Sequence, residues 1–162
     1  MINAFLYNIS NYFLSYIYNS KKLIFINKQF KNVIDIVIVV VMVKLYRKHL
    51  SEPWFSLMSV GCKTVEGRLN KGDWTSMEEG EHIDWYNEDY GIKRELRTVI
   101  LSKRVYQCLT YYLYTEGLNK TLCTIENLED GLKIYYSYYK PIDEEKHGIV
   151  AFELKVVSNG CK

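Results

Sequence analysis

The sequence predicts an α+β fold in which a mostly antiparallel sheet curls into a small β-barrel with short flanking helices. A strand-forming stretch comes first, at 36–48, and further strand patterns follow between 63 and 106. Two helical patterns then separate these strands from a closing strand at 148–156. Because strands and helices come in separate runs, the order is typical of α+β proteins. Closure into a barrel protects the edges of such a sheet.

The composition is that of one globular domain with an appendage. The chain has 162 residues, of which 48% are hydrophobic, which is enough to bury a core. We divide it into an N-terminal extension at 1–35, a domain at 36–157 and a tail at 158–162. The net charge is +2, and the lysines of residues 1–41 supply all of it, so the remainder is not basic. This excludes the broad positive surface that binds long duplex DNA.

Residues 1–41 differ from the rest of the chain. The first twenty carry no charged side chain, but their four asparagines make a poor membrane span. A signal peptide is not favoured, because the positive charge follows the apolar part instead of preceding it. The run Ile36–Val43 is too short to span a bilayer, and its β-branched residues favour a strand. We expect a disordered or loosely helical extension, or translation from Met42, in preference to a membrane anchor.

Start and stop signals place the helices. Ser51 is a candidate N-cap for a short amphipathic helix that ends near Gly61. Two further helices are expected at 107–116 and at 126–139, the second stopped by Pro141. The strands expected between the first two helices, besides the motif described next, are at 82–86 and, with a kink, at 93–106.

The motif Gly-Cys-Lys-Thr-Val-Glu-Gly-Arg at 61–68 concentrates the chemistry of the chain. Side chains alternate between the faces of a strand, so Thr64, Glu66 and Arg68 would share one face. A turn or twist at Gly61 and Gly67 would bring Lys63 round to the same side. Taken alone, the pattern favours an exposed edge strand with solvated charges over a functional loop. Glu66 and Arg68 are suited equally to a structural salt bridge and to ligand contact.

The cysteines show no pattern of a metal site. They are Cys62, Cys108, Cys123 and Cys161. No pair has metal-ligand spacing, and the three histidines add none, so we expect no metal and no cofactor. Free thiols are typical of a reducing, intracellular compartment. Cys62 lies next to Lys63 in the motif, where a nucleophilic role is open to it, although buried or incidental thiols are commoner.

Several motifs, in this order, resemble the ASCH domain family of the PUA-like superfamily. They lie at 52–55, 63–69, 79–83, 116–118, 128–131, 135–139 and 147–151. The resemblance covers nearly all of residues 43–157 and none of 1–35. It implies a PUA-like barrel with a cleft between barrel and helices, lined by the Lys/Glu/Arg motif, and a protein that binds RNA.

Some members of this family resemble amidohydrolases that remove acetyl groups from modified cytidine with a Lys, a Thr nucleophile and a Glu. The resemblance places the Lys at Lys63 and the Glu at Glu116, but Glu66 stands at the position of the nucleophile. Thr64 is near that position but out of register. A carboxylate does not take over the acyl chemistry of an activated hydroxyl unchanged.

We therefore expect an RNA- or nucleotide-binding protein whose partner is single-stranded RNA or a modified nucleoside or nucleotide. Lys63 and Arg68 are suited to phosphate, and Glu66 to an exocyclic amine; Thr64 lies between them. The aromatic residues suited to stack on a base, or alternatively to core packing, are Trp54, Trp74, Tyr136 and Tyr139. The alternatives are a hydrolase of a modified nucleoside or of RNA, using Lys63, Glu66 and Glu116, and an interaction protein with a vestigial cleft.

Overall fold

The computed structural model describes residues 23–25, 39–41 and 44–160, and it divides the chain into two units, Met1–Lys44 and Leu45–Lys162. In the first unit, β1 (Leu23–Phe25) pairs antiparallel with β2 (Val39–Val41). The expectations for residues 1–22 and 26–38 lie outside the described residues. Among the residues that are described, no helix has the length and hydropathy needed to cross a bilayer.

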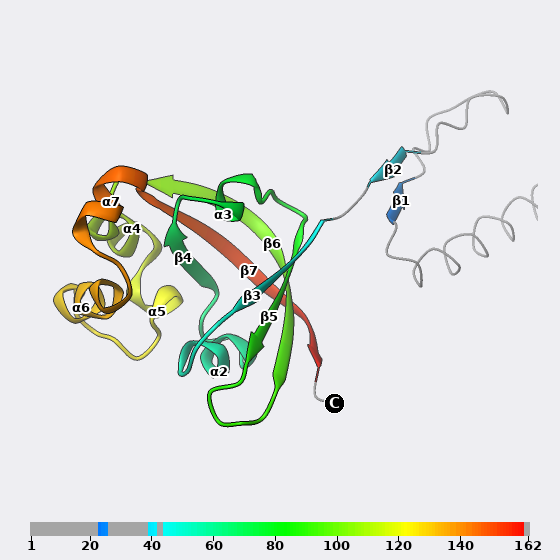
Figure 1. The fold of residues 1–162 in the computed structure, drawn as a ribbon, viewed down its shortest axis with the longest axis horizontal. Helices are drawn as coiled ribbons and strands as arrows, with labels where there is room; N and C mark the ends of the chain where they lie inside the picture. Colours follow the sequence, from blue (N-terminus) through cyan, green and yellow to red (C-terminus); the bar gives the residue numbers. More distant parts are fainter. Residues whose placement is uncertain (1–22, 26–38, 42–43, 161–162) are drawn as a thin grey trace, which may run out of the picture. The chain divides into compact units, whose positions relative to one another are not determined.

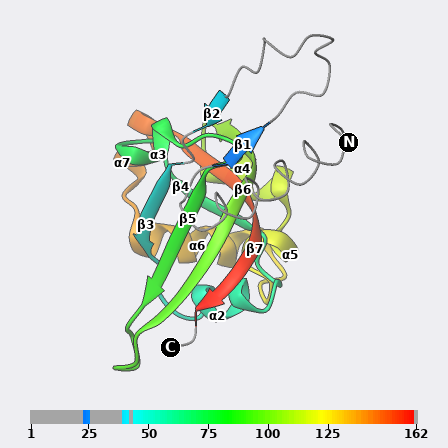
Figure 2. The same cartoon turned by 90° about the vertical axis from the view of Figure 1, so that its right-hand side faces the viewer.

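The second unit is built on a five-stranded sheet that curls into a half-barrel (Figures 1 and 2). Its strands, in spatial order, are β3 (Leu45–His49), β5 (His82–Asn87), β6 (Arg94–Tyr106), β7 (Ile149–Gly160) and β4 (Val65–Leu69). β3 runs parallel to β5, and the other neighbours are antiparallel. The predicted α+β class and mostly antiparallel sheet are therefore confirmed. The hydrogen-bonded ladder does not close the barrel, and β3 and β4 remain its edges.

The single strand predicted over 36–48 is wrong, because its described residues belong to two sheets. β2 lies in the two-stranded sheet and β3 in the five-stranded one. The kink predicted in the strand at 93–106 is confirmed. The pairing of β6 with β7 shifts register between Arg97 and Thr98 and again between Ile100 and Ser102. Such irregularities bend a strand and increase its twist, which helps the sheet to curl.

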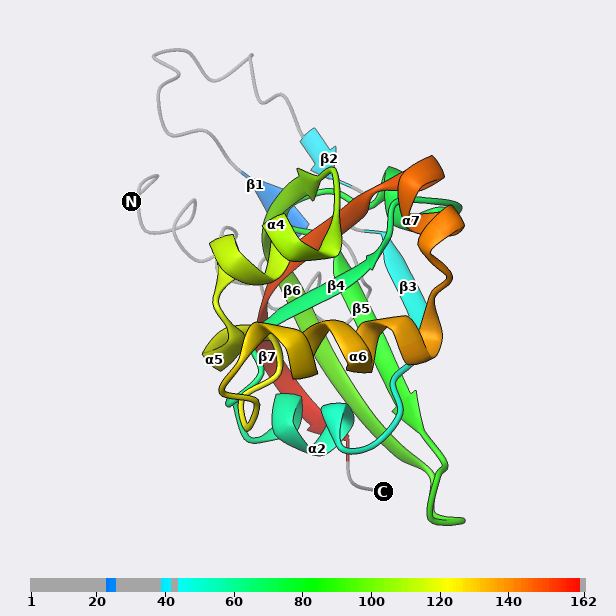
Figure 3. The ribbon, with the colours of Figure 1, turned by 90° about the vertical axis from the view of Figure 1, so that its left-hand side faces the viewer.

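The helices lie mainly in one connection, between β6 and β7, and cover one side of the sheet (Figure 3). They are α4 (Leu109–Glu116), α5 (Leu118–Thr121), α6 (Leu128–Tyr138) and α7 (Pro141–His147). α4 and α6 confirm the two predicted helices. The short α5 and α7 were not predicted from the sequence. Pro141 does follow α6, but it also begins α7, where its missing N–H is no loss.

Two shorter helices lie next to β4 in the sequence. α2 (Trp54–Ser59) precedes it, and α3 (Asp73–Ser76) follows it. The prediction of Ser51 as N-cap of the first helix is wrong: Pro53 holds that position, and no side chain caps the helix there. Leu50 and Ser51 instead connect β3 to α2, and the carbonyl oxygen of Ser51 accepts from the backbone N–H of Phe55 at 3.1 Å.

Two hydrophobic cores lie on the two faces of the sheet, and β7 contributes alternating residues to both. One fills the concave side of the half-barrel around Trp85, Phe152 and Met58. The other lies between the sheet and the helices and includes Tyr112 and Leu113 of α4. Trp54 packs against both. The open edge of the sheet and the end of α6 meet at this junction, and the candidate site is there.

Candidate functional site

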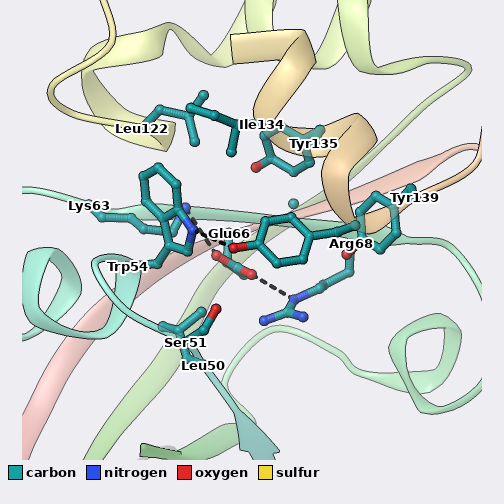
Figure 4. A pocket seen from close by; sticks show the side chains of 12 residues that line it. Leu50, Ser51, Trp54, Lys63, Glu66, Arg68, Leu122, Ile134, Tyr135 and Tyr139 are labelled. Carbon is teal, nitrogen blue, oxygen red and sulfur yellow. Dashed lines mark hydrogen bonds and ion pairs between the residues drawn. The ribbon is translucent and has the colours of Figure 1, made fainter. Parts of the chain in front are cut away.

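A cavity of about 220 Å³ lies beside the edge strand β4, between α2, α6 and the chain that leaves β3 (Figure 4). Segments far apart in the sequence line it. The lining residues are Leu50, Ser51, Trp54, Lys63, Glu66, Gly67, Arg68, Leu122, Ile134, Tyr135, Tyr138 and Tyr139. The cavity thus combines the charged residues of the motif with a cluster of aromatic rings.

The alternation of β4 positions the charged side chains. Val65 and Leu69 point into the helix-side core, while Glu66 and Arg68 point to the other face and into the cavity. The prediction that Glu66 and Arg68 share a face is therefore confirmed. Gly67 does not turn the chain as expected. It allows close packing instead, because a Cβ there would lie 2.4 Å from Cζ of Tyr112.

Lys63 is buried at the base of the cavity and has all of its donors engaged. Its Nζ donates to the carbonyl oxygens of Val65 at 2.8 Å and Thr121 at 2.5 Å. It lies 3.0 Å from Oε2 of Glu66. An ammonium group has three N–H donors, so these three acceptors use the whole group. Lys63 therefore ties the loop before β4 to the end of α5 and orients Glu66.

Glu66 is a buried carboxylate held between two cations. Its side chain is 7% exposed, with Lys63 on Oε2 and Nε of Arg68 2.6 Å from Oε1. Burial raises the pKa of Glu66, but attraction to Lys63 and Arg68 outweighs burial, and the net pKa lies below its ordinary value. The group is therefore ionised at neutral pH, so it offers hydrogen-bond acceptors to the cavity and no donor.

Arg68 connects the two edge strands of the half-barrel. Its Nη2 donates to the carbonyl oxygen of His49, at the end of β3, at 3.3 Å. Its guanidinium lies over the rings of Trp74 and Trp85, at 5.2 and 5.8 Å from their centroids. Nε, although close to Glu66, has no aligned acceptor among the described residues. The contact with Glu66 is thus an ion pair rather than a well-directed hydrogen bond.

Aromatic side chains form much of the remaining wall. Nε1 of Trp54 donates to the hydroxyl of Tyr138 at 3.4 Å, which brings α2 and α6 together. The hydroxyl of Tyr135 is hydrogen-bonded to that of Tyr112 at 2.9 Å. Burial and the nearby charge of Glu66 raise the pKa of Tyr135, and burial raises that of Tyr139, so both phenols stay neutral. These rings offer flat apolar surfaces with hydroxyl groups at their edges.

A second hollow, of about 570 Å³, adjoins the cavity. Arg68, Tyr138 and Tyr139 line both. Lys71 and Trp74, from the turn after β4 and from α3, also line the second one. Trp74 therefore belongs to this hollow and not to the cavity, and its ring packs against Trp85 and Phe152 of the half-barrel core.

The structure does not bring every predicted site residue to the cavity. Glu116 is 8% exposed and accepts hydrogen bonds from Nε and Nη2 of Arg104 at 2.6 and 2.8 Å, and from the hydroxyl of Tyr106 at 2.6 Å. Tyr136 donates to Glu144 at 2.8 Å. Thr64 is half-buried in the loop before β4 and is not part of the lining. The side chains of Glu116 and Tyr136 thus serve contacts elsewhere in the fold, and Thr64 is held through its backbone by Lys120 and Leu154.

Several lining residues are not indicated by the sequence pattern. They are Leu50, Ser51, Leu122, Ile134, Tyr135 and Tyr138. A helical period would have placed Tyr135, Tyr138 and Tyr139 near one face of α6, three and four residues apart. No local signal distinguishes Ser51 or Leu122, because only the tertiary fold brings them to β4. Among the described residues, no group of three or more His, Cys, Asp or Glu could hold a metal ion.

Comparison with known proteins gives a fold and no family. No family model matches the sequence, and no curated protein matches it. The chain is similar to the crystal structure of hypothetical protein PH0355, with TM-score 0.63 and 27% identity over 70% of this chain and 100% of that one. It is also similar to the solution structure of protein PF0455 from Pyrococcus furiosus, with TM-score 0.58 and 26% identity over 70% of this chain and 98% of that one. This chain thus shares the fold of the half-barrel and its helices with two proteins, each of which is matched over all or nearly all of its own length.

Proposed function

We propose that the protein is an RNA- or nucleotide-binding protein of the ASCH type, with a PUA-like barrel, and that the cavity beside β4 holds a nucleobase. One observation carries the proposal: the ionised carboxylate of Glu66 lies in a cavity walled by Trp54, Tyr135 and Tyr139. A base combines a planar face for such rings with N–H groups that a carboxylate accepts.

The dimensions and the charges of the two hollows support this proposal. At about 220 Å³ the cavity is smaller than the roughly 300–1,000 Å³ of pockets for drug-sized ligands, which suits a single base or nucleoside. Arg68 lines both hollows, and Lys71 lines the second. A phosphate attached to a base in the cavity would find its cationic partners there.

The hydrolase alternative has less support. The resemblance assigns its chemistry to Lys63, Glu66 and Glu116, but Glu116 is bound to Arg104 and is not part of the cavity lining. The donors of Lys63 are engaged by Val65, Thr121 and Glu66. A binding site needs neither group to be free.

Titration with nucleosides and oligoribonucleotides, followed by tryptophan fluorescence at two salt concentrations, tests the proposal. We expect quenching, because Trp54 lines the cavity. Glu66→Gln should weaken binding about tenfold or more, since a hydrogen bond to a charged group contributes roughly 1.5–3 kcal/mol. Glu95→Gln is the matched control, because that carboxylate pairs with Arg47 and Lys93 on the surface. Absence of binding to every ligand, or equal affinity of the two variants and the unaltered chain, contradicts the proposal.

A further inference from the structure

Cys62 and Cys123 lie close enough for their side chains to interact. Cys62 is exposed, in the loop before β4, and Cys123 is half-buried, just after α5. Two contacts hold their segments side by side. The backbone N–H of Thr64 donates to the carbonyl oxygen of Lys120 at 3.0 Å, and Nζ of Lys63 donates to that of Thr121 at 2.5 Å.

The backbone also fixes each cysteine. The N–H of Cys62 donates to the carbonyl oxygen of Leu57 at 3.0 Å, and that of Cys123 to the carbonyl oxygen of Leu118 at 2.9 Å. Cys123 has φ of 51°, in the left-handed region that few residues other than glycine adopt. The turn after α5 therefore sets the position of Cys123 against the loop that carries Cys62.

The two thiols interact and differ in character. Burial raises the pKa of Cys123 to about 12, together with a hydrogen bond and the charge of Cys62, while Lys63 opposes this rise. Cys123 therefore keeps its proton at neutral pH. Cys62 has the more accessible sulfur, so an oxidant in solution reaches it first.

We propose that Cys62 and Cys123 form a reversible disulfide, with Cys62 oxidised first and Cys123 as the resolving thiol. With hydrogen peroxide, the Cys62 thiolate takes one oxygen, giving a sulfenic acid and hydroxide. The sulfur of Cys123 then attacks that of Cys62, and the hydroxyl group leaves with the Cys123 proton as water. With glutathione disulfide, the Cys62 thiolate attacks one sulfur and releases the first glutathione, leaving a mixed disulfide. The sulfur of Cys123 then attacks Cys62 in that mixed disulfide, and the second glutathione leaves with the Cys123 proton.

The disulfide would act on the wall of the cavity. Lys63 follows Cys62 and Leu122 precedes Cys123 in the chain, and both line the cavity. In the reduced protein, hydrogen bonds hold the loop before β4 against the turn after α5. Oxidation therefore joins these two segments by a covalent bond. The proposal itself depends on the placement of the thiols and not on the nature of the ligand.

The test equilibrates the full chain in buffers of reduced and oxidised glutathione, traps free thiols with N-ethylmaleimide, and maps peptides by mass spectrometry. We expect a Cys62–Cys123 peptide to rise with the oxidised fraction until most of the protein contains it, and dithiothreitol to abolish it. Cys123→Ser should remove the linked peptide and leave glutathione on Cys62. Cys108→Ser, the loss of another half-buried thiol, is the matched control and should change nothing.

Three outcomes would overturn the proposal. The first is glutathione on Cys62 of the unaltered chain with no linked peptide. The second is a link from Cys62 to Cys108 or to Cys161. The third is a Cys62–Cys123 link that joins two chains, seen as a dimer on non-reducing gels.

Discussion

Glu66 and Lys63 show how a buried charge is kept in a small domain. A buried carboxylate is tolerated when cations and hydrogen bonds surround it, and removal of one partner leaves an uncompensated charge. Here Lys63 does more than pair with Glu66, because it also binds the carbonyl oxygens of Val65 and Thr121. The two residues are therefore one structural unit that also presents a carboxylate to the cavity.

Replacement of that lysine should cost far more than replacement of a surface lysine. We expect Lys63→Met to lower the free energy of unfolding by about 3–5 kcal/mol, the range for breaking a buried ion pair. Lys133→Met is the control, because its ion pairs with Glu129 and Asp130 are exposed and screened by solvent, so the substitution should change the free energy of unfolding little. Urea denaturation of both variants measures the difference. Equal losses would show that Lys63 does not stabilise the buried carboxylate.

The shared face of Glu66 and Arg68 could be predicted from the sequence because side chains alternate along a strand with a period of two. Alternation alone placed Glu66 and Arg68 on one face of β4, and the structure agrees. Glu116 could not be placed in the same way. Its partner Arg104 lies on β6, twelve residues earlier, and nothing in the sequence specifies that the two side chains meet. A predicted helix end assigns Glu116 to the last turn of α4, but it does not identify the residue that its side chain contacts.

At the scale of elements, β4 and α4 pack so closely at Gly67 that there is no room for a side chain between them. Gly67 faces the ring of Tyr112, and a Cβ would come within 2.4 Å of Cζ and 2.6 Å of the hydroxyl oxygen. The ring is fully buried and hydrogen-bonded to Tyr135, so it has little freedom to move away. The glycine thus brings the motif strand against the helix layer.

A methyl group at this contact should push the two elements apart. We expect Gly67→Ala to destabilise the protein by about 1–3 kcal/mol, the usual effect of overpacking a core. In a Tyr112→Leu background, which removes the ring, the same substitution should cost clearly less. Denaturation of the four proteins of this double-mutant cycle measures the coupling. Additive effects would mean that Gly67 and Tyr112 do not limit each other.

The elements themselves were predicted unevenly, for physical reasons. α6 has an N-cap, Asn127, which accepts from the backbone of Asp130, and a long apolar period, so the sequence indicates it clearly. α5 and α7 are short, and short helices carry little periodic signal. α7 also begins at Pro141, which was interpreted only as the stop of the preceding helix. Pro141 both prevents α6 from continuing and begins α7, and the sequence pattern indicates only the first of these two roles.

At the scale of the whole molecule, the cavity exists because the barrel is open. β3 and β4 are the edges of the sheet, and the chain between them carries α2 and the first part of the motif, with Lys63. Arg68 reaches across to the carbonyl oxygen of His49, and α6 covers the remaining space with its tyrosines. The site thus depends on contacts between distant segments, which is why the sequence could indicate the strand but not the complete wall.

Both cores of the second unit are assembled from residues between Leu50 and Leu154. A chain that starts at Met42 contains all of these residues and all five strands of the half-barrel. We therefore expect the protein from Met42 to Lys162 to fold cooperatively, with a Tm within a few degrees of that of the full chain. Differential scanning calorimetry of the two proteins measures this. A chain that starts at Met58 is the matched control: it lacks β3 and most of α2, exposes β5 as a new edge and removes Leu50, Phe55 and Trp54 from the cores, so it should lose the cooperative transition. A large drop in Tm for the Met42 chain would instead show that the first 41 residues contribute to the stability of the half-barrel.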